Sequence, residues 1–161
     1  MLAACHGRIE AQCQTLHRLS EHVARHGADE QARQAAESVM RYFDTAGRHH
    51  HEDEEQDVFP RVLSAVPESR RDIARALVAR LEKDHRGMEQ AWRELRGVLE
   101  RIARGEAVPL QVSDVGRFSS LYAEHIAVEE EQFLPLADSV LSAEVGEAIG
   151  QSMAKRRGVK L

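Results

Sequence analysis

Two copies of one pattern of histidine, glutamate and proline residues are the clearest chemical signal in this chain of 161 residues. The pattern occurs as His50-x3-Glu54-Glu55-x4-Pro60 and again as His125-x3-Glu129-Glu130-x4-Pro135, with an apolar residue before each proline. Residues four apart lie on one face of a helix, about 6 Å apart along its axis, so each histidine projects together with the first glutamate of its copy. Because imidazole and carboxylate groups are metal ligands, the repeat predicts a metal centre between helices.

Two further histidines lie on apolar stripes at helical spacing. His85 falls on the empty step between Leu81 and Met88, and His6 begins a similar stripe near the N-terminus. A single buried histidine is usually an ordinary core residue, but four of them, one on each long helix, need partners that an aliphatic core does not supply. The buried glutamates of the repeat would cost still more without partners. A bound cation would satisfy both kinds of group.

Breaker and capping residues divide the chain into four long helical segments and a shorter fifth. Gly27 suits the end of the first segment, Asp29 suits the N-cap of the second, and Pro60 is expected to kink the second before an apolar tail. The expected segments are about 2–26, 29–59, 69–104, 113–134 and 142–155. Long helices with short connections pack as antiparallel neighbours.

These segments predict an all-α fold, an up-down-up-down four-helix bundle with a short C-terminal fifth helix. The length fits a single domain over residues 1–161, with the bundle at about 2–137 and the C-terminal helix and tail at about 142–161.

The composition excludes several other classes of protein. Only two threonines and 4% aromatic residues accompany many helix-forming residues, which rules out an all-β or collagen-like chain. A net charge of −5 without a long basic block argues against nucleic acid as a partner. No leader-like segment and no apolar run of roughly 18 residues is present, so no membrane partner is expected. Cys5 and Cys13 would lie about 12 Å apart on one helix, too far for a disulfide, which predicts reduced thiols in a cytoplasmic protein.

On these residues the sequence resembles the hemerythrin-like HHE cation-binding domains, over nearly the whole chain. The resemblance implies a four-helix bundle that holds a non-haem diiron centre, with two iron ions joined by an oxo or hydroxo bridge. The positions that match the family's ligands are His6, His50, Glu54, His85, His125 and Glu129. The tail at 152–158 is also similar to the end of bacterial members.

The chain departs from the oxygen-carrying hemerythrins at one position. Those proteins have a second histidine one turn after the helix-three ligand, where this sequence has Glu89. Two roughly octahedral irons have about twelve coordination positions, and four histidines, two bridging carboxylates and an oxygen bridge fill about ten. Glu89, Glu10 or water is left to take the remainder, and a solvated helix flank is an equally good interpretation of Glu89. An oxygen-rich site favours ferric iron, and therefore redox or peroxide chemistry over reversible oxygen carriage.

Structural roles are expected for the other candidate residues. The histidines predicted to be exposed are His17, His22, His26, His49 and His51. Of the four acidic residues at 52–55, only Glu54 lies in line with the apolar stripe of its helix. The other three are expected on a solvated face. Core packing is expected for Trp92, Tyr42, Tyr122 and Cys5. The alternatives are a hydrogen bond from a tyrosine toward the site and a redox-active thiol at Cys5.

The leading hypothesis is a non-haem diiron protein that reacts with or senses a small molecule such as O₂, H₂O₂ or NO, or the iron and redox state. An alternative is a diiron peroxidase or reductase that detoxifies reactive oxygen or nitrogen species, so the sequence leaves open whether the protein is an enzyme. A further alternative is a ferritin-like or metal-free structural bundle, although ferritin-like sites have glutamate before histidine at i, i+3. Zinc or manganese would fit the same ligands as iron.

Overall fold

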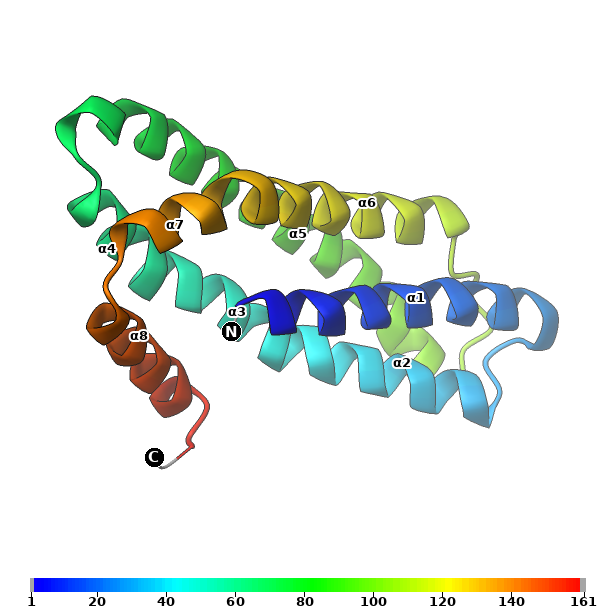
Figure 1. Cartoon of the computed structure of the whole chain (residues 1–161). Coiled ribbons are helices and arrows are strands. Elements are labelled where there is room, and N and C mark those ends of the chain that lie inside the picture. Colours follow the sequence, from blue (N-terminus) through cyan, green and yellow to red (C-terminus); the bar gives the residue numbers. More distant parts are fainter. Residues whose placement is uncertain (1, 160–161) are drawn as a thin grey trace.

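A computed structural model describes residues 2–159 of the chain, with side chains from residue 4, and every long element in it is a helix (Figure 1). The α-helices are α1 (Leu2–His26), α2 (Glu30–Tyr42), α3 (Arg48–Asp53), α4 (Phe59–Ala65), α5 (Arg71–Ala103), α6 (Val112–Val128), α7 (Leu134–Val140) and α8 (Ala143–Arg156). Three π-helical turns, η1 (Phe43–Gly47), η2 (Glu54–Val58) and η4 (Glu129–Phe133), and one 3₁₀ turn, η3 (Glu68–Arg70), join them.

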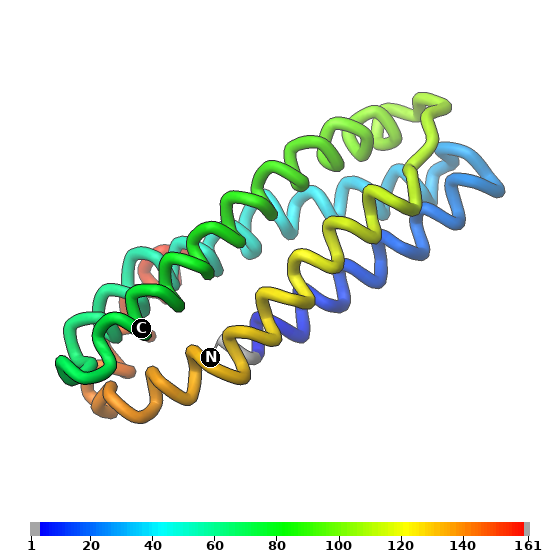
Figure 2. The backbone as a smooth tube through the Cα atoms, turned by 90° about the horizontal axis from the view of Figure 1, so that it is seen from above, coloured from blue at the N-terminus to red at the C-terminus, as the bar shows by residue number. Residues whose placement is uncertain are grey.

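The elements form four helical rods that run alongside one another (Figure 2). The second rod is continuous from α2 through α4, and the fourth runs from α6 through α7. α1 packs against α2 and α6, and α5 packs against the same two helices on the other side. The all-α four-helix bundle predicted from the sequence is therefore confirmed, and α8 is the short fifth helix. No helix among residues 2–159 combines the length and the apolar character that crossing a membrane requires.

Local sequence signals explain where the first helices end and begin. Gly27 follows α1 with a φ of 69°, a conformation that glycine adopts without steric cost. Asp29 is the N-cap of α2, and its carboxylate accepts a hydrogen bond of 2.9 Å from the backbone N–H of Ala32. Both features agree with the expected boundary between the first two segments.

The two prolines of the repeat each follow a π-turn. In η2 the N–H of Phe59 donates to the carbonyl of Glu54, and in η4 the N–H of Leu134 donates to the carbonyl of Glu129, five residues back in each case. Proline has no N–H to donate and its ring crowds the carbonyl four residues earlier, so a looser turn ahead of it relieves the conflict. The second rod therefore continues past Pro60 to Ala65, as the apolar tail predicted.

The core consists of two apolar clusters with a polar layer between them. One cluster lies toward the α1–α2 connection and includes Ile9, Phe43 and Met88, whereas the other lies toward α4, α7 and α8 and includes Phe59 and Phe133. Between the clusters every rod contributes a buried histidine, and the second and fourth rods also contribute a buried glutamate. The bundle thus holds its polar groups in a site that is closed by apolar side chains on both sides.

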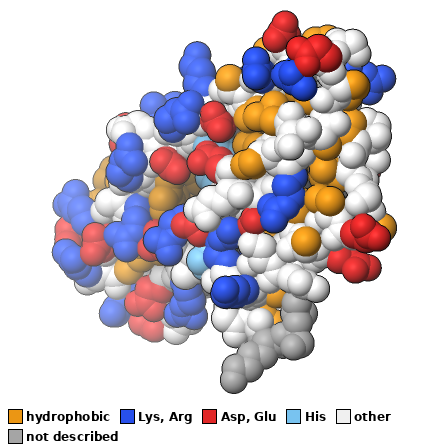
Figure 3. Space-filling model, turned by 90° about the vertical axis from the view of Figure 1, so that its left-hand side faces the viewer, with side chains coloured by type: hydrophobic (Ala, Val, Ile, Leu, Met, Phe, Trp, Pro, Cys, Tyr) orange, Lys and Arg blue, Asp and Glu red, His pale blue; other side chains and the backbone are white. Residues whose placement is uncertain are grey.

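Helix α8 is attached to the second rod by a group of ion pairs. Arg156 contacts both Asp53 and Asp57, with a distance of 2.7 Å to the Oδ2 of Asp57. Arg157 lies 2.6 Å from the other oxygen of Asp53, and Ser152 donates to Asp57 at 3.0 Å. The expectation that Asp53 lies on a solvated face is therefore wrong, because α8 covers it. Figure 3 views this end of the molecule, where acidic and basic side chains are interspersed.

Candidate metal centre

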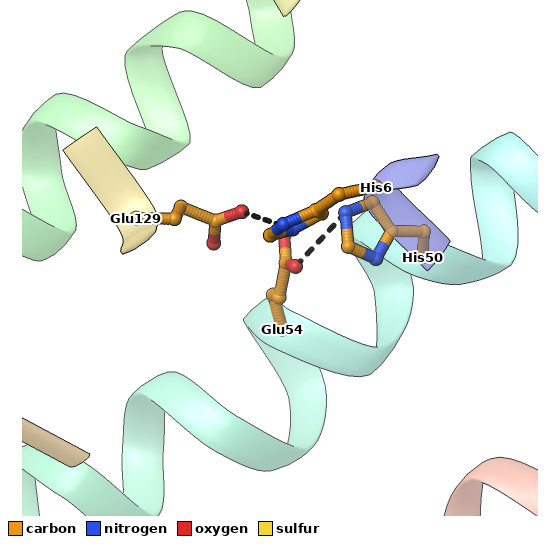
Figure 4. Close-up of side chains that lie close together, drawn as sticks. All are labelled: His6, His50, Glu54 and Glu129. Atoms are coloured by element: carbon orange, nitrogen blue, oxygen red, sulfur yellow. Dashed lines mark hydrogen bonds and ion pairs between the residues drawn. The ribbon is translucent and has the colours of Figure 1, made fainter. Parts of the chain in front are cut away.

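Four buried side chains from three rods converge on one point in the polar layer (Figure 4). The ligand atoms of His6, His50, Glu54 and Glu129 all lie within 4.8 Å of one another. His6 comes from α1, His50 from α3, and the two glutamates are the first residues of η2 and η4. This geometry matches a site for one metal ion with two imidazole and two carboxylate groups.

A second group of buried side chains adjoins the first. The ligand atoms of Glu54, His85 and His125 also lie within 4.8 Å of one another, and the Nε2 atoms of the two histidines are 3.2 Å apart. His85 comes from α5, which packs beside the second rod, and His125 comes from α6. All six residues predicted from the sequence as ligands are therefore brought together.

The two glutamates connect the two groups. One oxygen of Glu54 lies 3.2 Å from the Nε2 of His50, and the other lies 3.1 Å from the Nε2 of His85. A single oxygen of Glu129, Oε2, is 3.0 Å from the Nε2 of His6 and 3.4 Å from that of His125. Each carboxylate therefore lies between histidines of the two groups.

The buried polar atoms of this layer are short of hydrogen-bond partners. Among the described residues, both ring nitrogens of His50, both carboxylate oxygens of Glu54 and one oxygen of Glu129 are buried without a hydrogen bond. Each such group costs free energy unless something else satisfies it, and an unpaired carboxylate costs most. Cations at the two groups would satisfy the carboxylate oxygens and one ring nitrogen of His50, so the residues present fit a bound metal.

A model of the hemerythrin HHE cation-binding domain matches residues 1–137, which is the greater part of the chain. The chain belongs to this family. A protein of Haemophilus influenzae described as uncharacterized is 31% identical over 160 residues, a match that covers 99% of this chain and 90% of that protein. HHE domains bind metal cations, and the two His/Glu groups are the places in this domain that could hold them.

In the HHE domain without metal, burial makes the charged forms of the site's glutamates and of His50 unfavourable. Burial raises the pKa of Glu54 well above its usual range, and the charge of Glu129 raises it further. Burial also raises the pKa of Glu129, but hydrogen bonds from His125 and His6 outweigh this and hold it below the ordinary value. Burial lowers the pKa of His50 to about 3, which keeps its imidazole neutral and available for a metal.

The second glutamate of each repeat copy orients a histidine of another helix. The Nδ1–H of His85 donates to Glu55 at 2.7 Å, and the Nδ1–H of His6 donates to Glu130 at 2.9 Å. A carboxylate on Nδ1 fixes the ring so that Nε2 faces the buried layer, where it can bind a metal once it carries no proton. The repeat contained the signal for this role in its Glu-Glu doublet, but a regular helical period places only the first glutamate toward the site.

His51 is the main correction to the sequence predictions. It was expected to be exposed, but its side chain is buried and its ring stacks on that of His85, with centroids 4.0 Å apart and planes inclined by 11°. The hydroxyl of Tyr122 lies 3.4 Å from the Nε2 of His51. A helix inside a bundle faces two neighbours, so a residue 100° from the inward line is buried against the adjacent rod rather than solvated.

The remaining candidates lie outside the two groups. Glu10 and Glu89 are exposed, which favours the helix-flank interpretation of Glu89 over the ligand interpretation. His26 is exposed as predicted, whereas His17, His22 and His49 are half-buried and hydrogen-bonded to Ser119, Asp29 and Glu52. Cys5 is a buried free thiol, Tyr122 is buried, and Trp92 and Tyr42 are only half-buried.

Proposed function

We propose that this HHE domain holds two iron ions, joined by an oxo or hydroxo bridge, in a non-haem centre. The observation that carries the proposal is that Glu54 belongs to both groups of converging side chains. A single-metal site needs no carboxylate with one oxygen aimed at each of two histidine pairs. Nitrogen and oxygen donors without a thiolate suit iron, and manganese or zinc would compete for the same atoms.

The proposed ligands are the four histidines and two bridging glutamates, namely His6, His50, His85, His125, Glu54 and Glu129. Together with the oxygen bridge they fill about ten of the roughly twelve coordination positions of two octahedral ions. Because Glu89 and Glu10 are exposed and outside both groups, neither is proposed as a ligand. The positions left over are open to water or to a small oxidant.

The chain's own residues hold the centre, orient its ligands and limit access of water. The six side chains are at most 2% exposed, so the site is closed to bulk solvent. Glu55 and Glu130 fix the rings of His85 and His6. The iron pair, when bound, supplies one-electron steps at two adjacent ions. We therefore propose a protein that reacts with, or senses, O₂, H₂O₂ or NO.

A peroxidase or reductase for reactive oxygen or nitrogen species is the second candidate function. It is favoured by the glutamate in place of the second histidine of helix three, because that change removes one nitrogen ligand and leaves more of the centre open. Multiple turnovers with H₂O₂ or NO, lost in His85→Ala and retained in His26→Ala, are expected for such an enzyme. Stoichiometric oxidation that stops after one event would identify a sensor or carrier instead.

The free thiols of Cys5 and Cys13 support a reducing compartment, and we propose the cytoplasm.

Reconstitution with Fe(II) under argon followed by exposure to air tests the diiron assignment. The expected product is a pair of coupled ferric ions, with the absorption bands of an oxo bridge and no electron paramagnetic resonance signal. An isolated high-spin ferric signal that accounts for all the bound iron would show separate ions and overturn the proposal. Competition with Zn(II) and Mn(II) during loading reports the preference among metals.

A further inference from the structure

A pocket of about 410 Å³ lies beside the metal centre, between the second rod, α5 and α6. Its walls include residues of η1, α3 and α5, and its inner surface includes His51 and Tyr122. This volume is in the range of pockets that bind small organic molecules, and it far exceeds what a diatomic oxidant needs.

Aromatic side chains form much of the pocket. The rings of Phe43 and Trp92 have centroids 4.9 Å apart, and those of Phe43 and Tyr122 are 5.6 Å apart. The indole N–H of Trp92 donates to Asp44 at 3.0 Å, and Arg96 donates to the same carboxylate at 2.9 Å. These bonds fix the indole in place, so a planar ring would meet a preformed aromatic surface.

One of the three arginines that line the pocket has no ion pair among the described residues. Arg48 pairs with Glu52, Arg96 pairs with Asp44 and Glu100, and the third is Arg93. Arg93 donates to the neutral amide of Gln90, so its charge is not neutralised by that partner. An anionic group would therefore be favoured at the mouth.

At the inner end of the pocket, the ring of His51 separates the pocket from His85, a proposed metal ligand. His51 lines the pocket and stacks on His85 at 4.0 Å. The π-turn η1 supplies Phe43, Asp44 and Gly47 to the wall, and π-turns often occur at functional sites. A molecule in the pocket would be in van der Waals reach of a side chain that contacts the centre.

We infer that this pocket binds a planar aromatic molecule with one anionic group, of the hydroquinone class, which donates electrons to the metal centre. The electron-donor role rests on the proposed diiron function. In this step one hydroquinone loses two electrons and two protons and becomes a quinone. One electron goes to each of two ferric ions by way of the stacked His51 and His85 rings, and both protons leave to water at the mouth.

The binding half of the inference is tested with hydroquinonesulfonate as the probe. Trp92 is the single tryptophan of the chain, so its indole N–H gives an unambiguous nuclear magnetic resonance signal. In zinc-loaded, diamagnetic protein we expect a saturable shift of this signal with a Kd below about 1 mM. Methanesulfonate, an anion without a ring, should cause none. Absence of a saturable shift with the probe, or an equal shift with methanesulfonate, overturns the inference.

A pair of arginine variants tests the anionic preference. Arg93→Gln is expected to weaken binding of the sulfonate about three- to fivefold, the effect of removing one partly exposed charge, and to leave binding of neutral hydroquinone unchanged. Arg25→Gln, an exposed arginine elsewhere on the surface, should change neither. Equal affinities in the two variants would exclude recognition of the anion at this mouth.

The electron-donor half is tested with the ferric protein under argon. One quinone should form for every two ferric ions, and at low donor concentration the reaction should be slower in Arg93→Gln than in Arg25→Gln. If the hydroquinone binds but is not oxidised, the electron-donor role is refuted and the binding half of the inference still stands. If the protein holds no iron pair, the proposed function and the donor role fail together, whereas the Trp92 titration still decides the pocket.

Discussion

Glu55 accepts a hydrogen bond of 2.7 Å from the Nδ1–H of His85, although the two residues are separated by 30 positions in the chain. Glu55 is 40% exposed whereas His85 is fully buried, so the contact links the protein surface to the metal layer. The equivalent contact of the other repeat copy joins Glu130 to His6. Each repeat copy thus supplies one buried carboxylate that lies among the candidate ligands and one carboxylate that orients a histidine.

Replacing Glu55 by glutamine is expected to lower iron affinity about tenfold or more, because the partner that fixes the ring and tautomer of His85 is weakened. Competition with a chelator measures the affinity, and circular dichroism checks that the helices are retained. Glu131→Gln is the matched control, since Glu131 is exposed. Equal affinities for the two variants would show that Glu55 does not support the site.

Glu54→Leu is expected to stabilise the metal-free protein while it abolishes paired metal binding. The substitution removes two buried carboxylate oxygens that have no hydrogen bond, which should raise the free energy of unfolding by about 1–3 kcal/mol. Chemical denaturation without and with Fe(II) measures both effects. Iron should stabilise the wild type and leave the variant unchanged. If metal-free Glu54→Leu is less stable than the metal-free wild type, the buried carboxylate of Glu54 does not destabilise the fold as argued.

The attachment of α8 predicts a defined pH dependence. Burial raises the pKa of Asp57, but hydrogen bonds from Arg156, Arg61 and Ser152 outweigh it and hold the pKa below the ordinary value of 3.8. An acid whose pKa is lower in the folded state stabilises the protein above its unfolded pKa, and this contribution is lost as the pH falls through the folded pKa. Asp57→Asn should therefore cost about 2 kcal/mol of unfolding free energy near neutral pH.

This difference between wild type and Asp57→Asn should begin to shrink below about pH 4, where the unfolded carboxyl takes up its proton, and should disappear as the pH falls through the lower pKa of the folded state. Denaturation of the metal-free proteins across this range measures it. Asp72→Asn, at an exposed position of α5, serves as the control and should show little difference at any pH. A cost for Asp57→Asn that persists unchanged at pH 3 would rule out the ionised carboxylate as its source.

Glu89→Gln is expected to leave the number of bound metals unchanged. Glu89 is exposed and lies outside both groups of converging side chains, so no ligand is lost. Metal analysis after loading with Fe(II) measures the number, and His85→Ala provides the comparison in which a ligand is removed. Loss of one metal in Glu89→Gln would restore Glu89 as a ligand and require the side chain to turn inward on loading.

The fold and the six proposed ligands follow from the sequence because helical periodicity is regular over most of the chain. His85 and Leu81 lie on one buried face of α5, a single uninterrupted helix, and the expected boundary at Gly27 and Asp29 is observed. These predictions assume a regular period of 3.6 residues, so they fail where the structure departs from that period.

The sequence predictions missed a contact where the helical period changes, and they were wrong about burial where another helix packs over a residue. Glu55 is exposed, as expected, but it lies within the π-turn η2, and its hydrogen bond to His85 was not predicted. Asp53 was expected to be solvated, and its burial depends on α8, which is distant in the sequence. His51 is buried by the neighbouring rod, which a one-face description of a helix leaves out. Sequence spacing alone contains none of these tertiary contacts.

The most direct test of the central claim is the number of iron ions bound per chain after reconstitution with Fe(II) under argon and removal of unbound metal. Two groups of buried ligands that share Glu54 predict two irons per chain in the wild type. His26→Ala, at an exposed position, should also retain both. Fewer than one iron per chain in correctly folded wild-type protein would contradict the account.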